Sequence, residues 1–144
     1  MSFSVRPGQG EPSGFDLGDM EWAGDFGRIS SQGHVPDQGM MIYLSVSLLL
    51  DQLRGFLDGS ARVLSYHGID TSFGLVFRRG KQGISVGPRT GRGVISRFGR
   101  DALGEAVLRA ADEMAESRLG GVDEGDAGRA DYLASLRELR AAVG

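Results

Sequence analysis

The stretch Met40–Leu57, MMIYLSVSLLLDQLRGFL, is the most densely apolar segment of the chain and decides its fold. Its apolar side chains recur every three or four residues, which predicts one stripe of an α-helix: Val46, Leu49, Leu50, Leu53, Phe56 and Leu57. Ser45 suits the N-cap of this helix, and Gly59 suits the position that ends it. The run Met40–Leu44 predicts a buried extended segment before the helix. We therefore expect this helix to form the centre of the core.

Short strand patterns lie on both sides of this helix. They are predicted at Phe3–Val5, Met20–Ile29, Arg62–His67, Phe73–Arg78, Ile84–Val86 and Val94–Phe98. Turns of only a few residues join the last four, which favours an antiparallel meander. Two further helical patterns follow at Asp101–Leu119 and Ala130–Val143. This order predicts an α+β fold, with three helices packed on a mostly antiparallel sheet of about five or six strands.

The 144 residues suffice for a single domain spanning 1–144. Residues 7–19 and 30–39 are rich in glycine and in proline or serine, which predicts loops. The segment 120–128, GGVDEGDAG, predicts a flexible linker before the C-terminal helix.

Composition excludes several classes of function. The chain has no cysteine, which excludes disulfides, thiolate catalysis and cysteine-bound zinc, and favours a cytoplasmic location. The first ten residues lack the apolar region of a signal peptide, and the apolar run 40–50 is too short to cross a bilayer as a helix. The net charge of −3 argues against general attraction to nucleic acid or to anionic membranes. We expect neither as a partner, and we expect no cofactor and no structural metal.

Charge is unevenly distributed along the chain. Residues 62–100 hold eight basic residues and a single acid, Asp70, whereas residues 1–61 hold three basic and eight acidic residues. Arginine is suited to paired hydrogen bonds with carboxylates. The sequence therefore predicts that another protein with an acidic surface binds here, through Arg78, Arg79, Lys81, Arg89, Arg92 and Arg97. We expect Arg78 to point away from the strand face that bears Phe73, Leu75 and Phe77, and Arg79 and Lys81 to be exposed in the adjoining turn.

An alternative interpretation is intramolecular, with these arginines paired to the acidic helices of the same domain. Nucleic acid is disfavoured as a partner because Phe73 and Phe77 belong to the apolar strand face and offer no exposed stacking surface.

Two polar clusters suggest chemistry less strongly. His67 and Asp70 share the turn HGIDTS with Ser72, but a local Asx turn explains this spacing without a catalytic triad. His34 and Asp37 lie in the loop GHVPDQG and, with the acids of residues 16–25, could ligate a divalent metal, although no known metal motif is present. We assign no catalytic residue, and we keep His34, Asp37, His67 and Asp70 as an alternative polar site.

The segments GMMIYLSVSLLLDQLRGFLDG (39–59) and GIDTSFGLVFRRGKQG (68–83) resemble small uncharacterised proteins of actinobacteria, some of which are similar to immunity proteins that neutralise toxins. The resemblance spans residues 36–83 and, loosely, the flanking helices. It implies a protein-binding module of immunity-like or regulatory type. The alternative hypothesis is a small enzyme that uses histidine and carboxylates of the 16–37 loops and the 67–72 turn.

Overall fold

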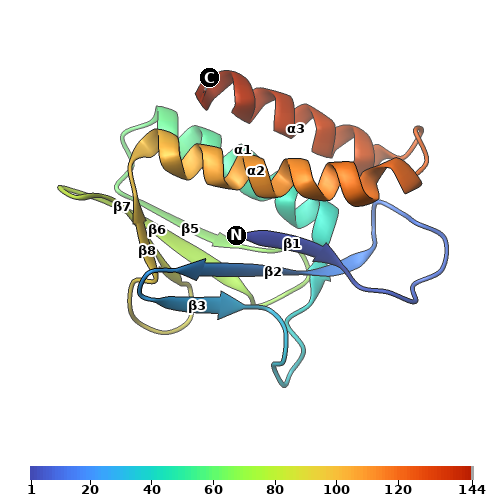
Figure 1. Ribbon diagram of the computed structural model, residues 1–144, viewed down its shortest axis with the longest axis horizontal. Coiled ribbons are helices and arrows are strands. Elements are labelled where there is room, and N and C mark those ends of the chain that lie inside the picture. Colours follow the sequence, from blue (N-terminus) through green and yellow to red (C-terminus); the bar gives the residue numbers. More distant parts are fainter. Residues whose placement is uncertain (144) are drawn as a thin grey trace.

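The computed structural model describes residues 1–143, which form three α-helices and eight strands (Figure 1). The helices are α1 (Ile42–Asp58), α2 (Arg100–Arg118) and α3 (Ala127–Val143), with a 3-10 turn η1 at Leu119–Gly121. The strands are β1 (Ser2–Val5), β2 (Leu17–Gly24), β3 (Gly27–Ser30), β4 (Met40–Met41), β5 (Val63–His67), β6 (Gly74–Gly80), β7 (Gly83–Pro88) and β8 (Ser96–Phe98). The helices lie together on one side of the strands, and α3 packs on α1 and α2 (Figure 1). The predicted α+β class with antiparallel strands is confirmed.

Helix α1 occupies the centre of the core, as its apolar stripe predicts. Leu49, Leu50 and Leu53 have no exposed side-chain surface. The predicted N-cap is wrong, because α1 already begins at Ile42, whose N–H donates to the Asp16 carbonyl at 3.0 Å. A backbone partner from a distant segment thus replaces the side-chain cap. Within the helix, the Ser45 hydroxyl instead accepts a hydrogen bond from the N–H of Ile69 at 2.9 Å.

The strands form two four-stranded antiparallel sheets rather than one sheet of five or six strands. The first sheet has the order β1-β2-β3, with β4 also paired to β2, and the second is the predicted meander β5-β6-β7-β8. Trp22 joins the two sheets in the core. Its ring packs edge-on against Phe77 and Phe98, at centroid distances of 6.1 and 5.7 Å, and its indole N–H donates to the Ser96 hydroxyl at 3.0 Å.

The predicted strand Met20–Ile29 is instead a hairpin made by β2 and β3. Gly24 pairs with Gly27 at its tip, and the turn lies between them. Phe26 lies in this turn and is 66% exposed. A side chain at Gly24 would place its Cβ only 2.2 Å from the Ile95 carbonyl oxygen. Glycine is therefore required there by close packing of the hairpin against the second sheet.

The segment predicted as a flexible linker is packed against the rest of the domain. Val122 is 2% exposed. The Asp126 carboxylate accepts hydrogen bonds from the N–H groups of Gly14 at 3.0 Å and Arg129 at 3.1 Å. This N-cap explains why α3 begins earlier than predicted.

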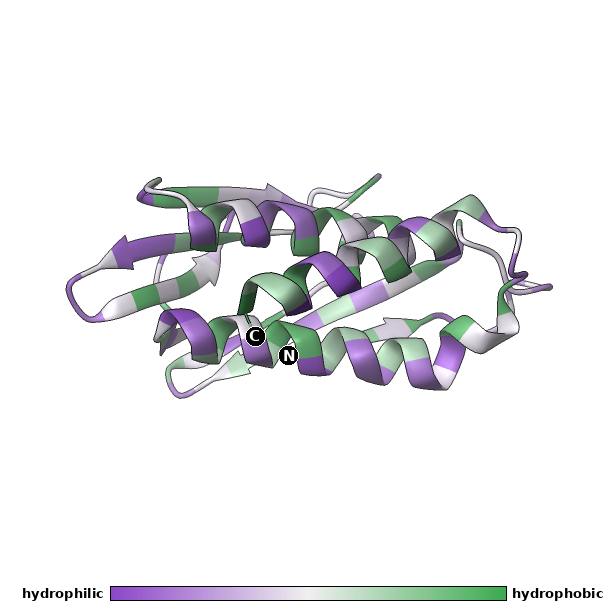
Figure 2. Cartoon of the chain, turned by 90° about the horizontal axis from the view of Figure 1, so that it is seen from above, coloured by the Kyte–Doolittle hydropathy of each residue, from purple (hydrophilic) through white to green (hydrophobic). Residues whose placement is uncertain are grey.

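The helix layer is amphipathic. Seen from the helix side, α2 and α3 alternate hydrophilic and hydrophobic residues along their length (Figure 2). Leu103, Val107 and Leu139 are fully buried, and the Tyr132 hydroxyl donates to the Ala111 carbonyl at 2.6 Å between the two helices. None of the helices within residues 1–143 is both long and apolar enough to span a bilayer.

Candidate functional site

The outward face of the second sheet carries a row of side chains that crosses all four strands. Val63 lies opposite Arg78, Arg78 opposite Ser85, and Ser85 opposite Arg97. Directly opposed residues of antiparallel strands share a face. Arg78 alternates with the fully buried Phe77, so the row points away from the core, as predicted for Arg78. The sheet thus places one arginine on each side of the Ser85 hydroxyl.

Two more of the predicted cations extend this surface. Arg89 lies over Gly74, where an added Cβ would be 2.6 Å from the arginine Cδ. Arg92 lies in the loop after β7 and, with Arg78 and Ser85, lines a cavity of about 230 Å³. We call Arg78, Arg89, Arg92 and Arg97 the arginine face. Lys81 is exposed at the tip of the β6–β7 hairpin.

The arginine face has no internal carboxylate partner. Within residues 1–143, neither its four cations nor Lys81 form an ion pair. Where acids of the helices form ion pairs, their partners are other arginines: for example, Glu138 lies 3.5 Å from Arg54, and Asp58 lies 2.9 Å from Arg100. The intramolecular alternative therefore does not describe these residues.

Arg79 differs from its neighbour Arg78, and its predicted exposure is wrong. It lies within β6 rather than in a turn and is partly buried. Its guanidinium donates to the carbonyl of Phe56 and, at 3.2 Å, to that of Ala61, and it lies 4.6 Å from the centroid of the Phe56 ring. Arg79 thus satisfies a carbonyl in the last turn of α1, which is a structural role.

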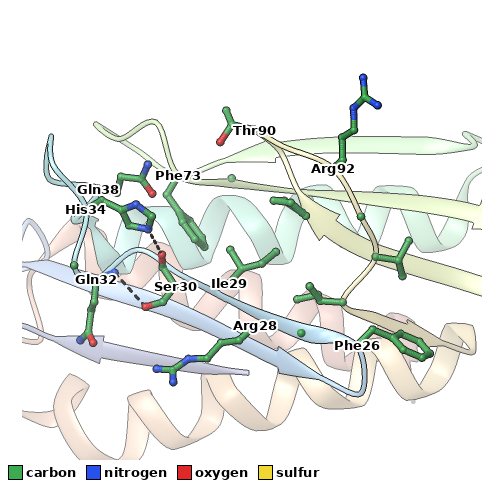
Figure 3. Close-up of a pocket in the computed structure, with 17 residues that line it drawn as sticks. Phe26, Arg28, Ile29, Ser30, Gln32, His34, Gln38, Phe73, Thr90 and Arg92 are labelled. Atoms are coloured by element: carbon green, nitrogen blue, oxygen red, sulfur yellow. Dashed lines mark hydrogen bonds between the residues drawn. The ribbon is translucent and has the colours of Figure 1, made fainter.

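A cleft of about 720 Å³ lies between β3 and the loop that follows β7 (Figure 3). Ile29 and Phe73 are central in it, while His34 and Gln38 lie at one end and Phe26 at the other (Figure 3). Its lining contains no aspartate or glutamate. The sequence did not predict this cleft, because its walls come from segments whose pairing has no local signature.

The four residues of the alternative polar site do not line one cavity, although the two segments that carry them touch: the Thr71 hydroxyl donates to the Gln38 carbonyl at 2.7 Å. His34 lines the cleft, with its Nε2 2.7 Å from the Ser30 carbonyl oxygen. Asp37, His67 and Asp70 do not line it, and the residues that form its walls include no carboxylate that could act with His34. Among the described residues, no three side chains of the histidine, aspartate and glutamate type are placed to hold a metal ion.

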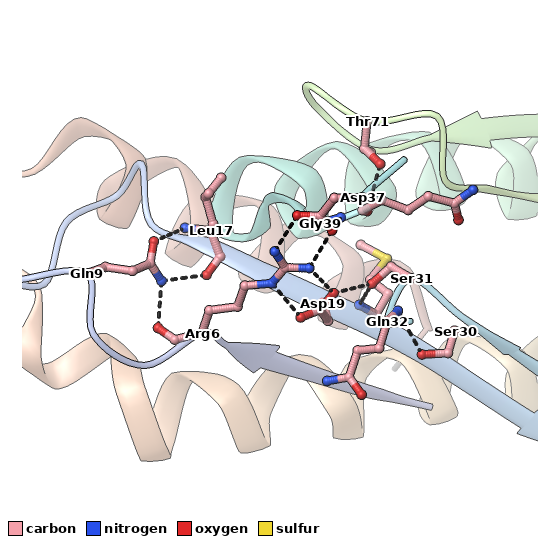
Figure 4. A network of polar contacts seen from close by, with 12 residues as sticks. Arg6, Gln9, Leu17, Asp19, Ser30, Ser31, Gln32, Asp37, Gly39 and Thr71 are labelled. Atoms are coloured by element: carbon pink, nitrogen blue, oxygen red, sulfur yellow. Dashed lines mark hydrogen bonds and ion pairs between the residues drawn. The ribbon is translucent and has the colours of Figure 1, made fainter. Parts of the chain in front are cut away.

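Arg6 organises the acidic loops instead (Figure 4). Its guanidinium donates to both carboxylate oxygens of Asp19, at 2.9 and 3.0 Å, and of Asp37, at 2.7 and 2.8 Å. The hydrogen bond with Arg6 holds the pKa of Asp37 far below its ordinary value. Burial alone would raise the pKa of Asp19, but hydrogen bonds from Arg6 and Ser31 lower it overall.

This network fastens the loop before α1, which carries His34 and Gln38, to β2. Sequence reasoning treated Asp19 and Asp37 as candidate ligands and missed Arg6. The available signal was that Arg6 is the only basic residue among the first 27. A lone cation among several acids is a natural centre for ion pairs.

Comparison with protein-family models, with curated proteins and with solved structures finds no match to this chain.

Proposed function

We propose that this protein is a binding module, of immunity-like or regulatory type, whose arginine face recognises an acidic surface on another protein. The partner's carboxylates would lie over the row formed by Arg78, Ser85 and Arg97. Arginine can hold a carboxylate through two parallel hydrogen bonds, which gives orientation as well as attraction.

This proposal rests on one observation: no carboxylate within residues 1–143 neutralises the two arginines of this row. The exposed Arg78 and Arg97 flank the buried Ser85 on the outward face of the second sheet, and neither arginine forms an ion pair within residues 1–143. Uncompensated like charges on one face are unfavourable for the isolated domain and favourable for an oppositely charged partner.

A protein partner is favoured over nucleic acid by the nature of the neighbouring side chains. Phe73 and Phe77 are buried and offer bases no stacking surface, and the exposed Phe26 lies in the β2–β3 turn rather than on the sheet that bears the arginine face. The absence of cysteine favours the cytoplasm as the place of action. The enzyme alternative has no comparable support, because Asp37 is held by Arg6 and the two histidines do not share a cavity.

Charge reversal tests the proposal. The wild-type chain and the double variant Arg78→Glu with Arg97→Glu are each immobilised and exposed to a cell extract at low salt. The double variant should not capture the proteins that the wild type captures. A purified partner should then associate more slowly with the variant, and its association rate should depend less on salt. Association can be followed by stopped-flow fluorescence at several ionic strengths.

The matched control is the double variant Arg109→Glu with Arg137→Glu, which changes the net charge equally on exposed residues of α2 and α3. It should bind the partner as the wild type does. Equal binding by the Arg78→Glu, Arg97→Glu variant and the wild type would refute the proposal, and a partner surface without acidic residues would do so as well.

A further inference from the structure

Strand β3 has one edge without a strand partner among the described residues. It pairs with β2 only, and it ends the order β1-β2-β3. The N–H of Ser31 donates to the Met20 carbonyl of β2 at 3.0 Å, so position 31 faces β2. Peptide groups along an antiparallel strand point alternately to the two sides. Position 29 therefore also faces β2, while Arg28 and Ser30 direct their peptide groups to the free edge.

Two hydrogen bonds confirm this direction and mark the ends of the free edge. At one end, the N–H of Phe26 donates to the Ile95 carbonyl at 3.0 Å. At the other, the Nε2 of His34 lies 2.7 Å from the Ser30 carbonyl oxygen. Between them, the N–H and C=O of Arg28 face the cleft without a partner among residues 1–143. An unpaired strand edge of this kind is a template for another strand.

The cleft along this edge has the chemistry of a peptide site. Its volume of about 720 Å³ lies in the range of ligand pockets, roughly 300–1,000 Å³. Ile29, Phe73 and Ile95 supply an apolar lining, and Figure 3 shows the side chains of Ile29 and Phe73 in the interior. No acid lines the cleft, whereas Arg28 and Arg92 do. Arg28 is paired with Glu21 at 2.6 Å, but Arg92 forms no ion pair within residues 1–143. The positive charge of Arg92 thus favours an anionic occupant.

We propose that the cleft binds an extended segment of a partner protein, which adds to β3 as a further strand through the peptide group of Arg28. Side chains of an added strand alternate between two faces. The residue beside Ile29 should be apolar and cover Phe73, and the residues on the face of Arg28 should be acidic. This site goes beyond the proposed function. The edge of β3 would bind main-chain groups of a partner, whereas the arginine face would bind a partner's carboxylates.

The proposal can be tested with capped heptapeptides in which glutamate alternates with valine or with phenylalanine. We expect one of them to bind, as measured by isothermal titration calorimetry, and to slow hydrogen exchange of the Arg28 amide by at least tenfold in NMR spectra. A peptide with the same sequence but N-methylated at alternate residues should not bind, because it cannot donate to the strand edge. A version with lysine in place of glutamate should bind at least tenfold more weakly.

A pair of variants separates the main chain of Arg28 from its side chain. Arg28→Pro removes the N–H that faces the cleft but no bond to β2, and proline is tolerated at such edge positions. It should abolish binding of the heptapeptide. Arg28→Ala keeps the N–H and should retain strand addition, with affinity reduced less than in Arg28→Pro. The N-methylated peptide gives the same information without altering the protein if Arg28→Pro does not fold.

Several results would overturn the inference. Equal binding by the N-methylated and unmethylated peptides would show that only side chains are recognised. Failure of both acidic heptapeptides to bind at millimolar concentration would exclude strand addition. A wild-type dimer in sedimentation experiments that Arg28→Pro makes monomeric would identify a second copy of the chain as the occupant. In the double variant Arg78→Glu with Arg97→Glu, the heptapeptide should still slow hydrogen exchange of the Arg28 amide. This result distinguishes a failure of the β3 site from a failure of the arginine face.

Discussion

Trp22 donates its indole N–H to the hydroxyl of Ser96 at 3.0 Å, and this buried bond links the two sheets of the domain. The replacement Ser96→Ala would leave the indole N–H without a partner in a dry environment. We expect a loss of about 1–3 kcal/mol in the free energy of unfolding, measured by urea denaturation. Ser65→Ala, on the exposed face of β5, is the matched control and should change stability by less than about 0.5 kcal/mol. A similarly small effect of Ser96→Ala would show that the two sheets do not depend on this bond.

Leu53 tests whether α1 is the centre of the core. Its side chain has no exposed surface, so Leu53→Ala should cost about 2–5 kcal/mol through lost burial and the resulting cavity. Val35 is 100% exposed, and Val35→Ala should be close to neutral. Guanidinium chloride titration of both variants gives the comparison. A loss below about 0.5 kcal/mol for Leu53→Ala would contradict the observed core.

Arg78 and Arg79 are adjacent in sequence and should respond differently to alanine. Arg79 binds a carbonyl at the end of α1 and lies over the Phe56 ring, so Arg79→Ala should destabilise the domain by about 1–2 kcal/mol. Arg78 is exposed and forms no ion pair within residues 1–143, so Arg78→Ala should lie within about 0.5 kcal/mol of the wild type. Thermal unfolding with chemical denaturation as a check distinguishes them. Equal losses would mean that Arg78 has a structural role and would weaken the proposed function.

The Arg6 network should make stability depend on pH. The folded protein holds the pKa of Asp19 below its ordinary value, so the stabilisation is present above the unfolded pKa, near 4, and is lost as pH falls through the folded pKa. Arg6→Gln should therefore destabilise the protein at pH 7, by about 1–3 kcal/mol, and the difference from the wild type should shrink below pH 4. Urea titrations at pH 7 and pH 3 measure this. A difference that does not depend on pH would exclude the ion pairs as its cause.

Two glycines should respond in opposite directions to alanine. Gly55 lies in α1 with nothing within 4 Å of an added Cβ, so Gly55→Ala should stabilise the protein by about 0.5–1 kcal/mol. At Gly24 the same methyl group would meet the Ile95 carbonyl oxygen at 2.2 Å, so Gly24→Ala should be destabilising. Differential scanning calorimetry of the two variants provides the test. Tolerance of alanine at Gly24 would show that the hairpin can move away from the second sheet.

Local patterns in the sequence were sufficient for the elements and for several side-chain directions. The 3.6-residue periodicity of 46–57 identified α1 and its buried stripe, and short turns identified the meander of the second sheet. The period of two placed Phe77 inward and Arg78 outward. These features depend on residues that are close together in the sequence, so they can be predicted before the fold is known.

Only the tertiary structure decided how these elements combine. Arg79 shares the inward face of its strand, but its contact with Phe56 depends on where α1 ends in space. Asp37 is held by Arg6, which is 31 residues away, and glycine is required at position 24 by the Ile95 carbonyl, which lies just before β8 of the second sheet. The free edge of β3 exists because the first sheet ends there. Such pairings bring distant segments together through hydrogen bonds and close packing, which leave no periodic signal in the sequence.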